Sequence, residues 1–248
     1  MRSTIELLNT WFLENGIVLV LIDLDDTLLK TGEIFETQIE KCILFLSDHC
    51  IVDEMALREK FTALNIQTFH TNGVNPNTKW KTLFELLVQD FPQIEPLRKE
   101  ALRILMEIYE IVPTLFPGVL KILEILSRCD IKLGLVTHAN KKWTNLKLRK
   151  LNLRRFFDKV IIINKNKFKD AKAWRRAAKQ FRIPLAQTVI IGDNLKGDIM
   201  AGAEAGVGKL IWVHWGGQWS IYQTGEIPQG TIVITGIHEL IPTLIKQL

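Results

Sequence analysis

The sequence predicts an α/β protein, in which a parallel β-sheet core carries an all-helical cap domain. Three observations lead to this fold class. Short, nearly continuous apolar runs such as 17–22 and 189–191 are typical of strands that are buried on both faces of a sheet. From residue 117 onward, such runs alternate with segments of helical periodicity. Between the first run and residue 117, apolar residues recur at helical spacing throughout.

The alternating part forms the predicted core domain, which we assign to residues 1–32 and 116–248. A short leading helix, 4–14, precedes the first strand, 17–22. Strands that are joined by helices run parallel and have both faces covered. The later elements are predicted as helix 119–129, strand 132–136, helix 143–151, strand 160–163, helix 171–181, strand 189–191, helix 195–205, strand 210–213, strand 232–234 and helix 237–245.

The insertion forms the predicted cap domain, residues 33–115. A turn-rich piece, 71–76, separates two of its helices, and Pro113 and Pro117-Gly118 close the segment. Three sets of apolar residues mark its helices: Phe35, Ile39, Cys42, Ile43 and Leu46; Trp80, Leu83, Phe84 and Leu87; and Leu97, Ala101, Leu102, Leu105 and Ile108.

The composition is that of an ordinary folded protein. Of 248 residues, 47% are hydrophobic and 24% are charged, which supplies a sizeable core and argues against global disorder. The cysteines, Cys42, Cys50 and Cys129, form no Cys-x-x-Cys pair, a pattern that fits a reducing compartment and predicts a cytoplasmic location. No apolar stretch reaches the roughly 18 to 20 residues of a membrane span. Acidic residues directly follow the short apolar run 16–22, so we interpret it as a strand and not as a signal peptide.

The net charge of +5 is unevenly distributed along the chain. Residues 141–182 contain 16 Lys and Arg against two acids, whereas the rest of the chain contains 16 bases and 25 acids. Such a basic band fits an anionic partner and equally fits solvated helix faces, and both interpretations stay open. Aromatic residues are not interleaved at the spacing of nucleic-acid-binding modules, which argues against RNA or DNA as the partner.

Chemically active side chains follow four of the predicted strands, and ligands of parallel α/β sheets bind at the carboxyl ends of strands. Each signal alone is weak, because a single Asp-x-Asp pair is as readily a turn or a helix cap. Together they bring acids, a hydroxyl and a lysine to one edge of the sheet. The four sites are Asp23-Leu24-Asp25-Asp26-Thr27, Thr137-His138, a loop with Lys165, Lys167, Lys169 and Lys172, and Gly192-Asp193-Asn194 with Asp198.

The converging carboxylates predict a bound cation. Two carboxylates ~4 Å apart repel by about 4 kcal/mol at an effective dielectric constant near 20. Without a counter-charge, a cluster of Asp23, Asp25, Asp193 and Asp198 would spread apart or take up protons. Carboxylate oxygens suit a hard divalent ion, and Mg²⁺ in particular keeps waters and binds substrate phosphates. We therefore expect a magnesium site that serves phosphoryl transfer.

These motifs resemble those of the haloacid dehalogenase superfamily, and within it the phosphatases whose helical cap is inserted after the first strand of a Rossmann-like core. The motif Asp-x-Asp-x-Thr matches residues 23–27, and the motif Gly-Asp-x-x-x-x-Asp matches residues 192–198. Thr137 matches the Thr or Ser that follows an apolar strand, and Pro117-Gly118 resembles the point where such chains re-enter the core. The resemblance covers nearly the whole chain.

The lysine motif departs from the common form of the family. Many relatives place Lys-Pro before the penultimate core helix, and this chain has no such pair. Alignment back from Asp193 puts Phe168 at the usual lysine position, with Lys167 and Lys169 on either side. Because Lys169-Asp170-Ala171 resembles a variant of the motif, we assign Lys169, with Lys167 and Lys172 as the alternatives.

The resemblance implies a role for each matched residue. Asp23 would be the nucleophile, and Asp25 would protonate the leaving group and then deprotonate water. Thr137 and Lys169 would hold the phosphoryl oxygens. His138 either contacts the substrate or is an exposed loop histidine. The magnesium ligands would be Asp23, the backbone carbonyl of Asp25, Asp193 and, in support of the ion or the lysine, Asp198.

The predicted function is hydrolysis of a small phosphorylated metabolite through an aspartyl-phosphate. Dehalogenases of the superfamily lack a carboxylate two residues after the nucleophile, so Asp25 argues against dehalogenation. Phosphonate cleavage would need a Schiff-base lysine in the cap, where the sequence offers no placed candidate. Phosphomutase chemistry stays open. A non-catalytic binding protein on the same fold is disfavoured, because intact buried acids are costly without an ion and a use.

Overall fold

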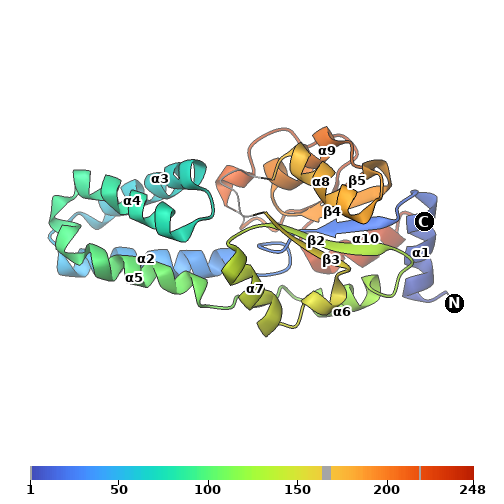
Figure 1. The fold of residues 1–248 in the computed structure, drawn as a ribbon, viewed down its shortest axis with the longest axis horizontal. Helices are drawn as coiled ribbons and strands as arrows, with labels where there is room; N and C mark the ends of the chain where they lie inside the picture. The colour runs from blue at the N-terminus through green and yellow to red at the C-terminus, as the bar shows by residue number, and fades with distance from the viewer. Residues whose placement is uncertain (1, 164–168, 218) are drawn as a thin grey trace.

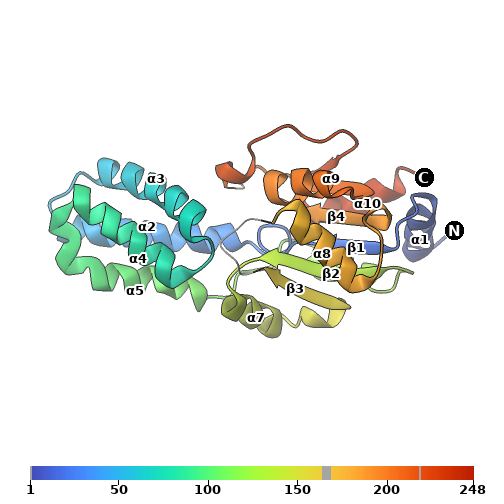
Figure 2. The ribbon, with the colours of Figure 1, turned by 45° about the horizontal axis from the view of Figure 1, so that its top comes forward.

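The structure consists of a sheet-containing part and a helical part that lie end to end along the long axis of the molecule (Figure 1). It is a computed structural model and describes residues 2–163, 169–217 and 219–248. Both chain termini lie beside α1, at the end of the molecule far from the helical part (Figures 1 and 2). Among the described residues, no helix has both the length and the apolar composition of a membrane span.

The sheet has six parallel strands in the order β3-β2-β1-β4-β5-β6, which confirms the predicted parallel α/β core. β2 and β3 lie on one side of β1, and β4, β5 and β6 lie on the other side, so the strand order reverses at β1. Such a reversal opens a crevice at the carboxyl ends of the strands. The strands are β1 (Leu19–Ile22), β2 (Lys132–His138), β3 (Lys159–Ile163), β4 (Thr188–Gly192), β5 (Lys209–Val213) and β6 (Ile232–Ile234).

Helices cover both faces of the sheet, and the side-chain alternation of the central strand shows how. Val20 and Ile22 pack in one cluster with α1, α6 and α10, whereas Leu19 and Leu21 pack in another with α8 and α9. Double coverage explains why β1 is apolar at every position. The core helices are α1 (Thr4–Glu14), α6 (Val119–Leu126), α7 (Lys141–Lys150), α8 (Ala171–Phe181), α9 (Ala201–Ala205) and α10 (Leu240–Ile245).

The helical part has a hydrophobic core of its own, centred on buried residues such as Trp80, Phe61 and Phe84. The turn-rich piece separates two helices as predicted: α3 ends before Gly73, whose φ of 60° favours glycine, and Asn75 caps the next helix by accepting from the amide of Asn77. We call this part the cap. Its helices are α2 (Thr31–His49), α3 (Glu54–Asn72), α4 (Pro76–Asp90) and α5 (Arg98–Met106).

The two chain crossings between the core and the cap lie side by side. The amide of Lys30 donates to the carbonyl of Thr114 at 2.9 Å, and the amide of Phe116 donates to the carbonyl of Leu28 at 3.0 Å. The core helix α7 also contacts the cap, because Trp143 belongs to the hydrophobic cluster of the cap. A short paired linker therefore joins the cap to the core, and α7 is one of the core elements that contact it.

Two boundaries differ from the sequence prediction in ways that matter for the site. Strand β2 extends to His138, so Thr137 lies within the strand and not after it. Residues Leu195–Met200 form a π-helix before α9, because the amide of Ile199 also bonds the carbonyl of Asn194. Wide π turns of this kind often occur at functional sites.

Candidate active site

The predicted acidic residues meet at the carboxyl ends of the two central strands. Asp23 follows β1 and Asp193 follows β4, and the amide of Asp23 still donates to the carbonyl of Ile191 at 2.9 Å. This last ladder bond fixes the backbone of Asp23 against the neighbouring strand. Both carboxylates are buried, as is that of Asp198 in the π-helix.

Asp23, Asp193 and Asp198 form one cluster, with carboxylate oxygens that all lie within 4.8 Å of one another. Gly192 makes this approach possible, because a Cβ at its position would lie 2.2 Å from a carboxylate oxygen of Asp198. Asn194 turns the chain between them: its side chain accepts from the amide of Gly197 at 2.7 Å. The spacing of the Gly-Asp-x-x-x-x-Asp motif thus brings its two acids to the same point.

Lys169 lies at the centre of this cluster. Its ammonium group forms ion pairs with Asp23 and with Asp198, and the side chain is only 4% exposed. Of the two alternatives, Lys172 is exposed on α8, while Lys167 lies outside the described residues, as does Lys165. Asp170 caps α8 by accepting from the amide of Ala173 at 2.7 Å, so Lys169 is the residue just before the helix cap.

The acids of the cluster have strongly perturbed protonation equilibria. Burial raises the pKa of Asp23 to about 7, against the lowering effect of Lys169. Burial likewise raises the pKa values of Asp193 and Asp198 above their usual range. Burial alone would lower the pKa of Lys169, but Asp198 and Asp23 raise it above its ordinary value. Lys169 therefore stays charged, and its single positive charge does not neutralise the three carboxylates around it.

Asp25 is held by a second buried lysine. Lys147 of α7, which is fully buried, forms an ion pair with the Oδ1 atom of Asp25. Thr31 donates to the same oxygen at 2.6 Å, and Thr137 donates to Oδ2 at 3.4 Å. The sequence prediction missed Lys147 and left it within the basic band. Helical spacing in the sequence could have identified Lys147, because Trp143 lies four residues before it on the same buried face of α7.

Asp26 and Thr27 organise the loop that follows β1. Asp26 has a φ of 58°, and its side chain accepts from the amide of Gly32 at 2.7 Å. Thr27 accepts from the amide of Asp193 at 3.0 Å and donates to its Oδ1 at 3.2 Å. The threonine of the first motif therefore positions an acid of the last one.

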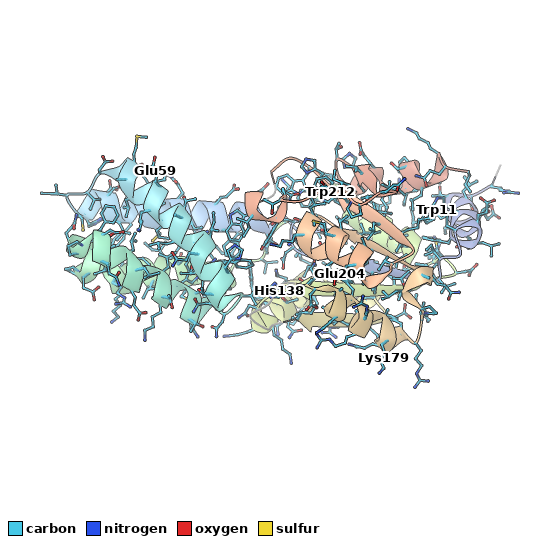
Figure 3. The ribbon with its side chains drawn as sticks, turned by 90° about the horizontal axis from the view of Figure 1, so that it is seen from above. Trp11, Glu59, His138, Lys179, Glu204 and Trp212 are labelled. Atoms are coloured by element: carbon cyan, nitrogen blue, oxygen red, sulfur yellow. The ribbon has the colours of Figure 1, made fainter. Side chains whose placement is uncertain are left out.

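A cavity of about 500 Å³ lies between these residues and the cap. His138 lies where the core meets the cap (Figure 3), lines this cavity, and packs against Phe69 of α3 with ring centroids 6.4 Å apart. It is thus half-buried at the site and not a free loop histidine. The segment after β5 reaches the cap as well (Figures 1 and 2). Trp219 of this segment lies 5.1 Å from Phe69 between ring centroids.

The cap contributes one lysine to this cavity, which corrects the expectation that the cap offers none. Lys79 of α4 lines the cavity together with Asp23 and Thr137. Its side chain is buried, and its ammonium lies 4.2 Å from the ring centroid of Trp80. Trp80 itself is fully buried in the cap, where its Nε1 atom donates to the hydroxyl of Tyr109 at 3.2 Å. Lys79 lies four residues before Leu83 and eight before Leu87, so helical spacing places this lysine on the buried face of α4.

The donor set of the acidic cluster fits a magnesium ion. Asp23, Asp193 and Asp198 offer only oxygen atoms, which hard divalent cations prefer. They lie close enough to share one ion, and Lys169 alone leaves them with a net negative charge. The raised pKa values have the same physical origin, since burial penalises charges that no cation offsets.

Comparisons with known proteins find related sequences and related folds. A curated glyceraldehyde 3-phosphate phosphatase from Pyrococcus abyssi is 31% identical over 104 residues, which is 40% of this chain and 42% of that protein. The chain therefore matches less than half the length of this relative.

Solved structures share the fold over almost the whole chain. A haloacid dehalogenase-like family hydrolase from Xanthomonas campestris has a TM-score of 0.74 at 18% identity, covering 94% of this chain and 93% of its own. A putative hydrolase of the same group from Bacillus subtilis, bound to magnesium, has a TM-score of 0.67 at 19% identity, covering 92% and 98%. The sequence model of the haloacid dehalogenase-like hydrolases matches residues 20–213, a range that includes every candidate residue from Asp23 to Asp198, and the chain belongs to this family.

Proposed function

We propose that this protein is a magnesium-dependent phosphomonoester hydrolase that acts through an aspartyl-phosphate on Asp23. One observation carries the proposal: a buried lysine, Lys169, joins two members of a compact cluster of three carboxylates, and this cluster opens on a cavity beside Asp25. A phosphoryl group needs such a combination of nucleophile, oxygen ligands for a metal, and a fixed cation.

The proposed reaction assigns a role to each of these side chains. A carboxylate oxygen of Asp23 attacks phosphorus, and the bond from phosphorus to the ester oxygen breaks. Asp25 gives its proton to the departing alcohol, then takes a proton from the water that attacks phosphorus and releases Asp23 and inorganic phosphate. Thr137 and Lys169 bind the phosphoryl oxygens. Lys147 and Thr31 hold the carboxylate of Asp25 in place between the two steps.

Magnesium would be bound by Asp23, Asp193 and the backbone carbonyl of Asp25, with Asp198 in support. When bound, it would supply charge neutralisation for the phosphate and the acids. Lys169 supplies the second part of that charge, since the phosphate dianion and the carboxylates together exceed one divalent ion. The magnesium-bound relative from Bacillus subtilis supports this assignment at the level of the shared fold.

The substrate class of the proposal is a small phosphorylated metabolite. The phosphatase name of the Pyrococcus relative supports phosphate-ester chemistry, although the match covers less than half of that protein. A cavity of about 500 Å³ accommodates a small or medium-sized phosphomonoester. We further propose that the protein acts in the cytoplasm and binds neither a membrane nor a nucleic acid.

The proposal includes the division into a core of residues 1–32 and 116–248 and a cap of residues 33–115. A separate hydrophobic cluster and the paired crossings at Lys30 and Phe116 support it. A cap joined through so short a linker can hinge there and exclude water from the aspartyl-phosphate.

A direct experiment tests the function. Phosphate release from p-nitrophenyl phosphate is measured with the purified protein in magnesium and in excess EDTA, with Asp23→Asn as the control for contaminating activity. We expect turnover that requires the metal and disappears in the variant. Turnover that persists in Asp23→Asn would refute Asp23 as the nucleophile. Absence of phosphate release from every phosphomonoester tried would favour a non-catalytic role or another chemistry of the family, such as phosphonate cleavage with Lys79.

A further inference from the structure

Lys79 is a buried lysine to which the described residues bring no counter-charge. Its side chain belongs to α4 of the cap and is 4% exposed. Within the described part of the chain, its ammonium forms no ion pair and no hydrogen bond, and its recorded contacts are with aromatic rings. Charged side chains are rarely buried without a partner, because desolvation disfavours the charged form.

Aromatic rings surround this ammonium. Its distances to the ring centroids are 4.2 Å for Trp80, 5.5 Å for Phe35, 5.7 Å for Phe69 and 5.7 Å for Trp219. Cation–π attraction from these faces favours the charged form and offsets part of the loss of water. The offset is incomplete, since burial lowers the pKa of Lys79 to about 7. Among the described residues no acid offsets the charged form of Lys79, so an anionic ligand group would stabilise it.

The other strong cations of the cavity already have partners. Arg58 donates to both carboxylate oxygens of Glu40 and to Glu54, and Lys169 pairs with the buried acids of the core. Among the described lining residues, Lys79 is thus the lysine or arginine without an acidic partner. A neutral ligand group at this position would leave the charge uncompensated, whereas a negative group would offset it.

The position of Lys79 suits the far end of a substrate. Lys169 and Asp23 lie at the core end of the cavity, and Lys79 lines the same cavity from the cap. The rings around Lys79 connect the two ends: Phe35 contacts Trp143 of α7 at 5.9 Å, and Phe69 contacts His138 of β2 at 6.4 Å, both between ring centroids. A molecule whose phosphate lies against Asp23 can therefore extend along these rings toward the ammonium.

We propose that Lys79 binds a second anionic group of the substrate, so that the protein prefers phosphomonoesters that carry a carboxylate or another phosphate at a distance from the reacting one. The inference rests on the proposed phosphatase function and adds a specificity-determining residue to it. An ammonium held in a desolvated aromatic site forms charge-assisted hydrogen bonds with carboxylate or phosphate oxygens that are stronger than those formed in water.

Matched substrate pairs test this inference. The ratio of kcat/KM values is measured in magnesium for 3-phosphoglycerate against glycerol 3-phosphate, and for fructose 1,6-bisphosphate against fructose 1-phosphate. The first pair isolates a carboxylate and the second isolates a second phosphate. The wild-type protein should favour the more anionic member of at least one pair by about 10- to 100-fold, the amount expected for one buried charge-assisted hydrogen bond.

Variants assign that preference to Lys79. Lys79→Met should abolish this preference, and Lys79→Arg, which keeps the charge, should retain most of it. Lys81→Met is the matched control, because Lys81 belongs to the same helix and is 68% exposed.

Each outcome decides the inference. A wild-type protein that hydrolyses p-nitrophenyl phosphate but shows no preference within either pair refutes it, and this outcome requires no folded variant. A preference that survives in Lys79→Met refutes it as well. If the wild-type protein releases phosphate from none of these compounds, the proposed function itself fails, a result distinct from the loss of preference.

Discussion

Replacing Lys169 by Met tests the arrangement at the centre of the site. The substitution keeps most of the apolar stem and removes the ammonium that joins Asp23 to Asp198. All three side chains are buried, so water cannot replace the lost charge without a rearrangement. Phosphate in the transition state would lose a fixed donor at the position where its charge is held.

The expected loss follows from that geometry. Removing one preorganised donor from a buried site that stabilises a developing anion costs about 3 to 4 kcal/mol. This corresponds to a fall in kcat/KM of roughly 100- to 1,000-fold. In the metal-free protein, the variant also leaves two buried carboxylates without their cation. Magnesium should therefore raise the thermal unfolding midpoint of the variant by more than that of the wild type.

The assay is p-nitrophenyl phosphate hydrolysis in saturating magnesium, with Lys172→Met as the control because Lys172 is exposed on α8 only three residues away. The control should stay within about threefold of the wild type, as expected for a surface site. A folded Lys169→Met protein with kcat/KM within threefold of the wild type would show that another group carries the phosphate charge. A crippled Lys172→Met protein would show that the lysine assignment is misplaced.

Four other predictions concern the rest of the site. Excess EDTA should abolish turnover and added magnesium should restore it; full activity in chelator would exclude a metal role for the acidic cluster. Asp23→Asn should remove turnover while the circular dichroism spectrum and the unfolding midpoint show a folded protein, because the amide is nearly isosteric but a poor nucleophile. Lys147→Met should lower kcat by at least about tenfold, because it removes the ion pair that holds Asp25, the general acid. The control variant Lys142→Met, at an exposed position of α7, should keep the wild-type kcat. A wild-type kcat in Lys147→Met would contradict the positioning role of Lys147. Burial lowers the pKa of Lys79 to about 7, so between pH 7 and 9 the unfolded chain binds a proton that the folded protein has released. The free energy of unfolding should therefore rise with pH in this range, by up to about 1.4 kcal/mol per pH unit. Urea titrations of Lys79→Met should lack this increment.

Periodicity alone predicted most of the architecture, because the spacing of apolar residues along the sequence shows which face of a strand or helix is buried. The leading helix, the helix Ala171–Phe181 and the strand Ile232–Ile234 have the predicted limits. Errors of one to three residues appear where tertiary contacts set the boundary, as at the carboxyl end of β2. There, pairing of His138 with Ile163 extends the strand beyond its apolar run.

The sequence by itself determined the acids of the site, since parallel strands bring their carboxyl ends to one edge wherever the chain provides them. Asp23 and Asp193 therefore had to converge once β1 and β4 became neighbours. The sequence also indicated Lys169, with Lys167 and Lys172 as alternatives, but only the tertiary structure showed its ion pairs and brought Lys147 to Asp25 and Lys79 to the cavity. Lys147, Lys169 and Lys79 come from α7, from a loop and from the cap, and a lysine side chain is long enough to turn toward either solvent or the site. Helical spacing places Lys147 and Lys79 on the apolar faces of α7 and α4. It does not show what they meet there, because the carboxylate of Asp25 and the aromatic rings of the cap are brought to these lysines only by tertiary packing.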